Sequence, residues 1–118
     1  MFTCDNKGDY LLATVSGYYS LDLFITAIHE VSEHCKKENL KKALLDLRNL
    51  EGDPSILDRY RFGLEIAKAW GPLLKVAAVA KPEAINKMGE NTAVNRGANV
   101  WATPDMELAL QWLGVEHT

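Results

Sequence analysis

Short apolar runs along the chain alternate with longer stretches in which apolar residues recur every three or four positions. The runs at 43–47 and 76–80 are apolar at nearly every position, as expected of parallel strands that are covered on both faces. Between 20 and 37, apolar residues recur at helical spacing and predict an amphipathic helix. This alternation predicts an α/β domain with a mostly parallel sheet and helices packed on it.

Turn and capping residues bound the remaining elements. The predicted elements, in chain order, are strands at 2–5 and 10–15, a helix at 20–37, a strand at 43–47, a helix at 55–70, a strand at 76–80, a helix at 82–97 with a break near Gly89, a strand at 98–102 and a helix at 104–113. The order β-β-α-β-α-β-α-β-α predicts a mixed, mostly parallel sheet of about four to five strands with four helices. The first strand is expected at an edge.

Length and charge narrow the classes of function. The 118 residues suit a single domain, 1–118, and the net charge of −3 gives no basic surface for nucleic acid or an anionic membrane. No apolar run reaches the roughly 20 residues of a membrane span, and the amino terminus lacks the charged opening of a signal peptide. The cytoplasm is therefore the expected compartment, and Cys4 and Cys35 are expected to be free thiols.

Two stretches of the chain carry a resemblance to a known family. The central stretch, Leu44-Leu45-Asp46-Leu47-Arg48 followed by Asp53-Pro54-Ser55, resembles the centre of a STAS domain. That family comprises anti-sigma factor antagonists and the cytosolic tails of sulfate transporters. The second half resembles the bacterial SpoIIAA-like (STAS/SEC14-like) subgroup through Asp58-Arg59, Lys75 to Ala80, Glu90-Asn91, Ala93 to Gly97 and Ala109 to Leu113.

Ser55 has two interpretations. The resemblance implies a serine that a kinase phosphorylates to switch partner binding, and Ser55 lies near that position. Pro54 departs from the Asp-Ser pair of the family. As the N-cap of the helix at 55–70, Ser55 also has a sufficient structural role, since its hydroxyl can accept a backbone N–H of the first turn.

The other candidate chemistry is a group of charged residues around the end of a strand and the start of the next helix. It consists of Asp46, Arg48, Asp53, Asp58 and Arg59. Ligands of open α/β sheets gather at the carboxyl ends of strands, so either ion pairs or a bound small anion would account for the group. No sequence motif of a hydrolase, nucleotide-binding loop or metal site is present, and neither a cofactor, a metal nor an enzymatic activity is expected.

Three large apolar residues lie off the densest apolar stripes of their helices. If Trp70, Leu108 and Trp112 are exposed, they form an interface patch and favour a homodimer; otherwise they widen the buried face. The sequence therefore favours a non-catalytic regulatory or protein-interaction module, with an unidentified protein or a second copy as partner. The alternative is a carrier or sensor of a small apolar or lipid-like ligand, and an enzyme is less favoured.

Overall fold

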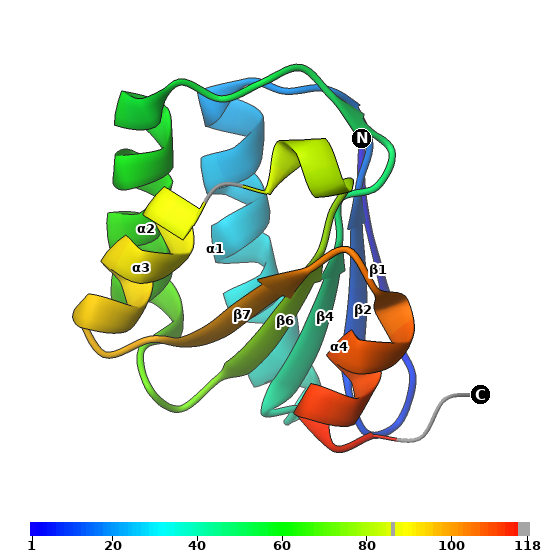
Figure 1. Ribbon diagram of the computed structural model, residues 1–118. Helices are drawn as coiled ribbons and strands as arrows, with labels where there is room; N and C mark the ends of the chain where they lie inside the picture. The colour runs from blue at the N-terminus through cyan, green and yellow to red at the C-terminus, as the bar shows by residue number, and fades with distance from the viewer. Residues whose placement is uncertain (86, 116–118) are drawn as a thin grey trace.

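A five-stranded mixed sheet forms the centre of the molecule (Figure 1). The structure is a computed structural model that describes residues 1–85 and 87–115. The strands lie in the order β1-β2-β4-β6-β7, with bounds Phe2–Asn6, Leu11–Val15, Lys42–Asp46, Lys75–Val79 and Asn99–Thr103. Only the pairing of β1 with β2 is antiparallel. The predicted hairpin, its edge position and the mostly parallel sheet are thus confirmed.

The strands β4 and β6 are the parallel central neighbours that the apolar runs predict. Their register places Ala43 beside Val76. Consecutive side chains of β4 enter different cores: Leu44 packs with the core on one face of the sheet and Leu45 with the core on the other. Both faces are therefore covered, which explains why these strands are apolar throughout rather than alternating.

Helices form a layer on each face of the sheet (Figure 1). The helices α1, α2 and α3, with bounds Leu21–Glu38, Ile56–Trp70 and Lys87–Asn95, lie on one face, and α4, Met106–Leu113, lies on the other. A single 3₁₀ turn, Pro82–Ala84, which we call η1, follows β6. A second sheet, too short for the sequence pattern to predict, pairs β3, Gly17–Tyr18, with β5, Leu50–Glu51.

The predicted helix at 82–97 is the one element that the structure corrects. Its break lies between η1 and α3, where Ile85 is extended, and Gly89 lies within α3 rather than at a break. Gly89 instead allows close packing, since a Cβ atom on it would collide with the Phe62 ring of α2. The general rule that glycine interrupts a helix fails here, because α2 packs so closely that only a residue without a side chain fits at position 89.

We expect Gly63→Ala to destabilise the fold, although helix propensity alone favours alanine by about 1 kcal/mol. A Cβ atom on Gly63 would lie 2.6 Å from the carbonyl oxygen of Gly89 and 2.8 Å from the Cβ atom of Thr92. Pushing α3 away should cost about 1–3 kcal/mol, measured as the free energy of unfolding in urea. Ala67→Gly, in the same helix, measures how much helix propensity alone changes the free energy of unfolding. A Gly63→Ala chain more stable than the wild type would show that α3 is not held tightly against α2.

Candidate functional site

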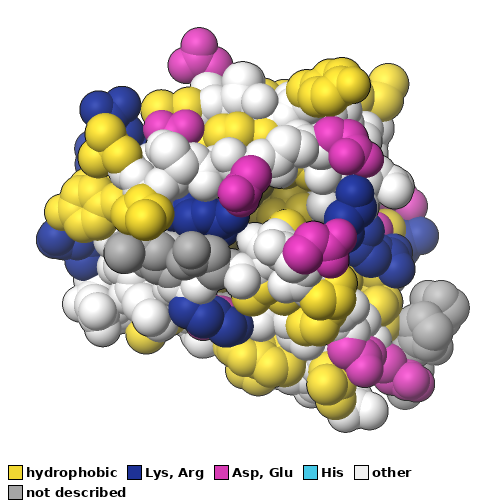
Figure 2. All heavy atoms as spheres, turned by 45° about the horizontal axis from the view of Figure 1, so that its top comes forward, with side chains coloured by type: hydrophobic (Ala, Val, Ile, Leu, Met, Phe, Trp, Pro, Cys, Tyr) yellow, Lys and Arg dark blue, Asp and Glu magenta, His cyan; other side chains and the backbone are white. Residues whose placement is uncertain are grey.

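The carboxyl ends of β4 and β6, the start of α2 and η1 meet at one end of the molecule, at the top of Figure 1. We call this surface, formed by residues 46–60 and 80–85, the strand-end face. Figure 2 brings it forward and shows a recess with hydrophobic side chains at its floor and side chains of both charges around it. Most of the candidate residues from the sequence lie here.

Ser55 is the N-cap of α2, as predicted. Its backbone is extended, with φ −66° and ψ 163°, and its Oγ atom accepts the backbone N–H of Asp58 at 3.1 Å. This contact satisfies one of the donors that a helix start leaves free, and the Asp58 carboxylate in the first turn suits the helix dipole. Ser55 is nevertheless an exposed residue.

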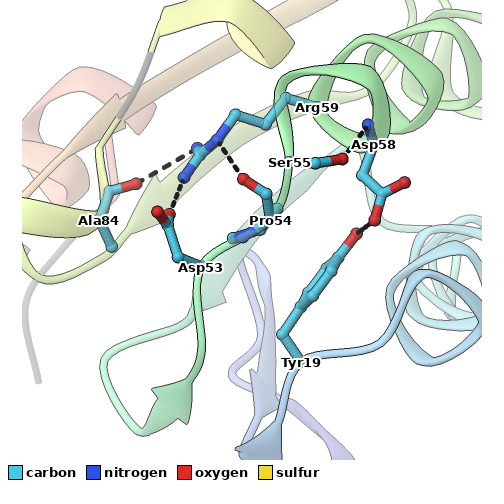
Figure 3. A network of polar contacts seen from close by, with 7 residues as sticks. All are labelled: Tyr19, Asp53, Pro54, Ser55, Asp58, Arg59 and Ala84. Atoms are coloured by element: carbon cyan, nitrogen blue, oxygen red, sulfur yellow. Dashed lines mark hydrogen bonds and ion pairs between the residues drawn. The ribbon is translucent and has the colours of Figure 1, made fainter.

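Arg59 is buried behind Ser55 and ties three segments together (Figure 3). Its Nη2 donates to Asp53 Oδ1 at 2.8 Å, its Nε to the Pro54 carbonyl at 3.2 Å and its Nη1 to the Ala84 carbonyl at 3.3 Å. The side chain of Arg59 is only 8% exposed, whereas that of Asp53 is 87% exposed. One guanidinium thus fixes the loop before α2 and the end of η1.

Asp46 and Arg48 form a separate bidentate pair at the end of β4. The Arg48 Nε and Nη2 atoms donate to the two carboxylate oxygens of Asp46, each at 2.9 Å, and the Arg48 backbone N–H donates to Oδ1 at 3.1 Å. The hydrogen bonds from Arg48 hold the pKa of Asp46 below its ordinary value of 3.8. This geometry closes the turn that follows the strand.

Asp58 pairs with a residue that the sequence did not single out. Its Oδ2 atom accepts the hydroxyl of Tyr19 at 3.2 Å, which connects the start of α2 to the segment before α1 (Figure 3). Burial, together with the negative charge of Asp58, raises the pKa of Tyr19 to about 12. The predicted group of five charged residues is therefore divided: in the described part of the chain, no ion pair joins Asp46–Arg48 to Asp53–Arg59.

Exposed apolar side chains beside Ser55 are the feature that the sequence analysis missed. Ile56 is 66% exposed, Leu57 57% and Tyr60 40%, and all three lie in the first turn and a half of α2. They are neighbours, because residues three and four positions apart share one side of a helix. The signal in the sequence was two apolar residues directly after the N-cap, of which Leu57 lies off the apolar stripe that continues through Phe62 and Ile66.

The predicted interface of Trp70, Leu108 and Trp112 does not exist as one patch. Trp70 is 5% exposed and donates its indole N–H to the Ile28 carbonyl at 2.9 Å, so it fastens the end of α2 to α1 in the core. Trp112 packs with the core on the opposite face of the sheet, half-buried, 5.8 Å from the ring centre of Trp101. Only Leu108, at 46%, is substantially exposed. Of the two alternatives for Trp70, burial therefore holds, because α1 covers the side of α2 that carries it.

Two adjacent apolar cavities lie under the strand-end face. They have volumes of about 90 and 70 Å³ and share six lining residues. The shared residues are Phe24, Leu47, Arg59, Phe62, Ala80 and Ala84. The cavities therefore lie between the sheet, α1, α2 and η1, with the buried guanidinium of Arg59 as the polar group common to both walls.

The remaining candidate chemistry gives no further site. Among the described residues, no three His, Cys, Asp or Glu side chains are grouped so that they could hold a metal ion. Cys4 and Cys35 are free, and burial raises the pKa of each thiol to about 11. No described helix is long and apolar enough to cross a membrane.

Comparison with known proteins identifies the architecture. The structure superimposes on the crystal structure of an anti-sigma factor antagonist from Mycobacterium paratuberculosis with a TM-score of 0.62, over 97% of this chain and 93% of that one, at 17% sequence identity. The chain has a STAS-like fold. No family model matches the sequence, and no curated protein is significantly similar to it. The STAS-like fold indicated by the residues around Asp46 and Ser55 is thus confirmed.

The cap at the start of α2 makes a testable contribution to stability. We expect Ser55→Ala to lower the free energy of unfolding by about 0.5–2 kcal/mol, because the Asp58 N–H loses its acceptor. Ser55→Asp should cost less, since aspartate also caps and its charge suits the dipole. Ser20→Ala is the matched comparison, because Ser20 caps α1 through Leu23 in the same way. Thermal melts check both; an unchanged melt for Ser55→Ala would refute the capping argument.

The Asp46–Arg48 pair should make stability depend on pH in the acid range. Because the pKa of Asp46 is lowered in the folded state, the pair stabilises the fold above the unfolded pKa of about 4 and loses this effect as the pH falls through the folded value. We expect Arg48→Gln to lower the melting temperature at pH 7 and this difference to shrink in acid. Lys7→Gln, which breaks the exposed pair with Asp5, should change little. A difference that persists at pH 2 would contradict the assignment.

Proposed function

We propose that the chain is a non-catalytic regulatory module that docks another protein through the start of α2. The observation that carries the proposal is the exposed apolar group Ile56, Leu57 and Tyr60 directly beside the exposed cap Ser55. A group of neighbouring apolar side chains on the surface is the usual mark of a protein contact. Support also comes from the fold, since the similar solved structure is that of an anti-sigma factor antagonist. A partner of the anti-sigma factor class is therefore the one to test first.

The environment of Ser55 suits regulation of this surface by phosphorylation. A phosphate on Oγ would add about 1.5 to 2 negative charges at a helix N-terminus, whose free N–H groups can donate hydrogen bonds to its oxygens. Asp53 and Asp58 lie on either side of Ser55 in the chain, so the added charge would make the area beside Ile56 strongly acidic. An apolar partner surface that docks on the unmodified face would then lose affinity.

Binding rather than catalysis is also what the local geometry favours. The Ser55 hydroxyl oxygen accepts the Asp58 N–H. The carboxylate of Asp46 is held by Arg48 and that of Asp53 by Arg59, so each already has a cationic partner. The arrangement stabilises loops and presents a surface, which is the task of a docking module.

A second candidate function, the uptake of a small apolar ligand, is favoured by the two cavities. Their volumes of about 90 and 70 Å³ together compare with the roughly 150 Å³ in which an engineered protein cavity holds benzene. A compact apolar molecule matches this space.

Self-association and location remain predictions. A second copy as partner is supported by the exposed Leu108 on α4, next to the half-buried Trp112. Sedimentation at micromolar concentration, with wild type and Leu108→Ser, decides whether a homodimer forms. A cytoplasmic location is consistent with a partner of the anti-sigma factor class.

Replacing the apolar group should abolish docking without unfolding the chain. The partner is first captured by crosslinking in the protein's own cells, purified, and titrated against the variants by calorimetry. We expect the double variant Ile56→Ser/Leu57→Ser to bind about ten-fold or more weakly, because it removes the centre of the apolar contact. Leu73→Ser is the matched control, since Leu73 is equally apolar and 84% exposed but lies after the other end of α2.

The same titration separates the two interpretations of Ser55. As a phosphorylation switch, Ser55→Asp weakens partner binding while its melting temperature stays near that of the wild type. As a cap alone, Ser55→Asp binds the partner like the wild type. Equal loss of affinity in the Leu73→Ser and Ile56→Ser/Leu57→Ser variants would refute docking at the start of α2.

A further inference from the structure

Arg59 is a buried cation with unused hydrogen-bonding capacity. A guanidinium carries five N–H donors, and only three of those of Arg59 have acceptors, in Asp53, Pro54 and Ala84. Among the described residues, no other group accepts from Arg59. A bound carboxylate could accept one further N–H from each of its two Nη atoms.

The counter-charge of Arg59 is also easily replaced. Asp53 supplies the only carboxylate paired with Arg59 among the described residues, and its side chain is 87% exposed, in contrast to the 8% of Arg59. Glu90 lines the larger cavity as well, but its Oε1 atom is held by Lys87 Nζ at 3.2 Å and by the backbone N–H of Ala102. In the larger cavity, the acidic residue Glu90 is therefore already hydrogen-bonded, whereas the cation Arg59 can bind an anion.

The rest of both cavities is apolar. Besides Arg59 and Glu90, the lining residues in the described part of the chain are all hydrophobic or glycine. Phe24 and Phe62, whose ring centres are 4.7 Å apart, contribute to both cavities. Such walls take up the compact hydrocarbon part of a molecule, while the guanidinium binds a carboxylate with two parallel hydrogen bonds.

We propose that the strand-end face binds a small organic carboxylate with a compact aromatic or branched apolar body. The carboxylate lies on the Nη atoms of Arg59 in place of Asp53, and the apolar body fills the space between Phe24, Phe62 and Ala80. The proposal rests on the second candidate function, uptake of an apolar ligand, and adds the chemical class of that ligand. The volumes of the cavities limit the body to about the size of a benzene ring.

The test uses benzoate and, as its uncharged counterpart, toluene, each titrated into the ¹⁵N-labelled full chain. Amide shifts of residues along the cavities report binding. We expect benzoate to bind the wild type and to bind Asp53→Asn about ten-fold more tightly, because the competing carboxylate is gone. Asp5→Asn is the matched control, an exposed aspartate that pairs with Lys7 far from Arg59 in sequence, and should leave the affinity unchanged.

Two further variants locate the ligand. Arg59→Gln should lose benzoate but retain toluene, and Ala80→Leu, which fills the space common to both cavities, should lose both probes. If Arg59→Gln does not fold, the Asp53→Asn variant still tests whether the carboxylate binds Arg59. The Asp53 side chain is exposed, so its replacement leaves the core intact. Binding of toluene without benzoate would overturn the carboxylate assignment and leave uptake of an apolar ligand standing. Binding of neither probe would overturn both, and the same benzoate affinity in Asp53→Asn and Asp5→Asn would place the anion away from Arg59.

Discussion

A single buried guanidinium connects the segments that build the strand-end face. Arg59 is almost wholly removed from water, and the free energy that this costs is offset only while its donors have acceptors close by. Two of those acceptors are main-chain carbonyls, of Pro54 in the loop before α2 and of Ala84 in η1. The position of the loop before α2, and of the turn after β6, therefore follows from the hydrogen-bonding needs of one side chain.

The helix that carries Arg59 serves the core and the surface at the same time. Along its inner side, Phe62, Ile66 and Trp70 pack against the sheet and α1. At its start, Ile56 and Leu57 remain in water. The exposed apolar group Ile56, Leu57 and Tyr60 lies on the same helix, beside the Ser55 cap. One helix can thus leave apolar side chains in water at its start while its later turns pack into the core.

The candidate site could be predicted from the sequence where its contacts are local. The Ser55 cap spans three residues and the Asp46–Arg48 pair spans two, so residue type and spacing are sufficient to indicate them. Arg59 reaches Ala84 across 25 residues, and Tyr19 reaches Asp58 across 39. These longer contacts divide the charged residues into separate pairs, a result that depends on how β3, β5 and η1 are placed and has no signature in the spacing.

The amino-acid sequence by itself determined the order of the five strands of the main sheet and of the four α-helices, the parallel neighbours β4 and β6, the hairpin at the sheet edge and the cap of α2. Each of these rests on hydrophobic periodicity or on hydrogen bonds between residues close in the chain. Only the tertiary structure decided that Gly89 lies inside a helix and that Trp70 is buried. Both outcomes depend on which helix lies alongside, α2 for Gly89 and α1 for Trp70. The apolar cavities beside Arg59 likewise arise between elements distant in sequence, since the space left after packing is a property of the assembled layers.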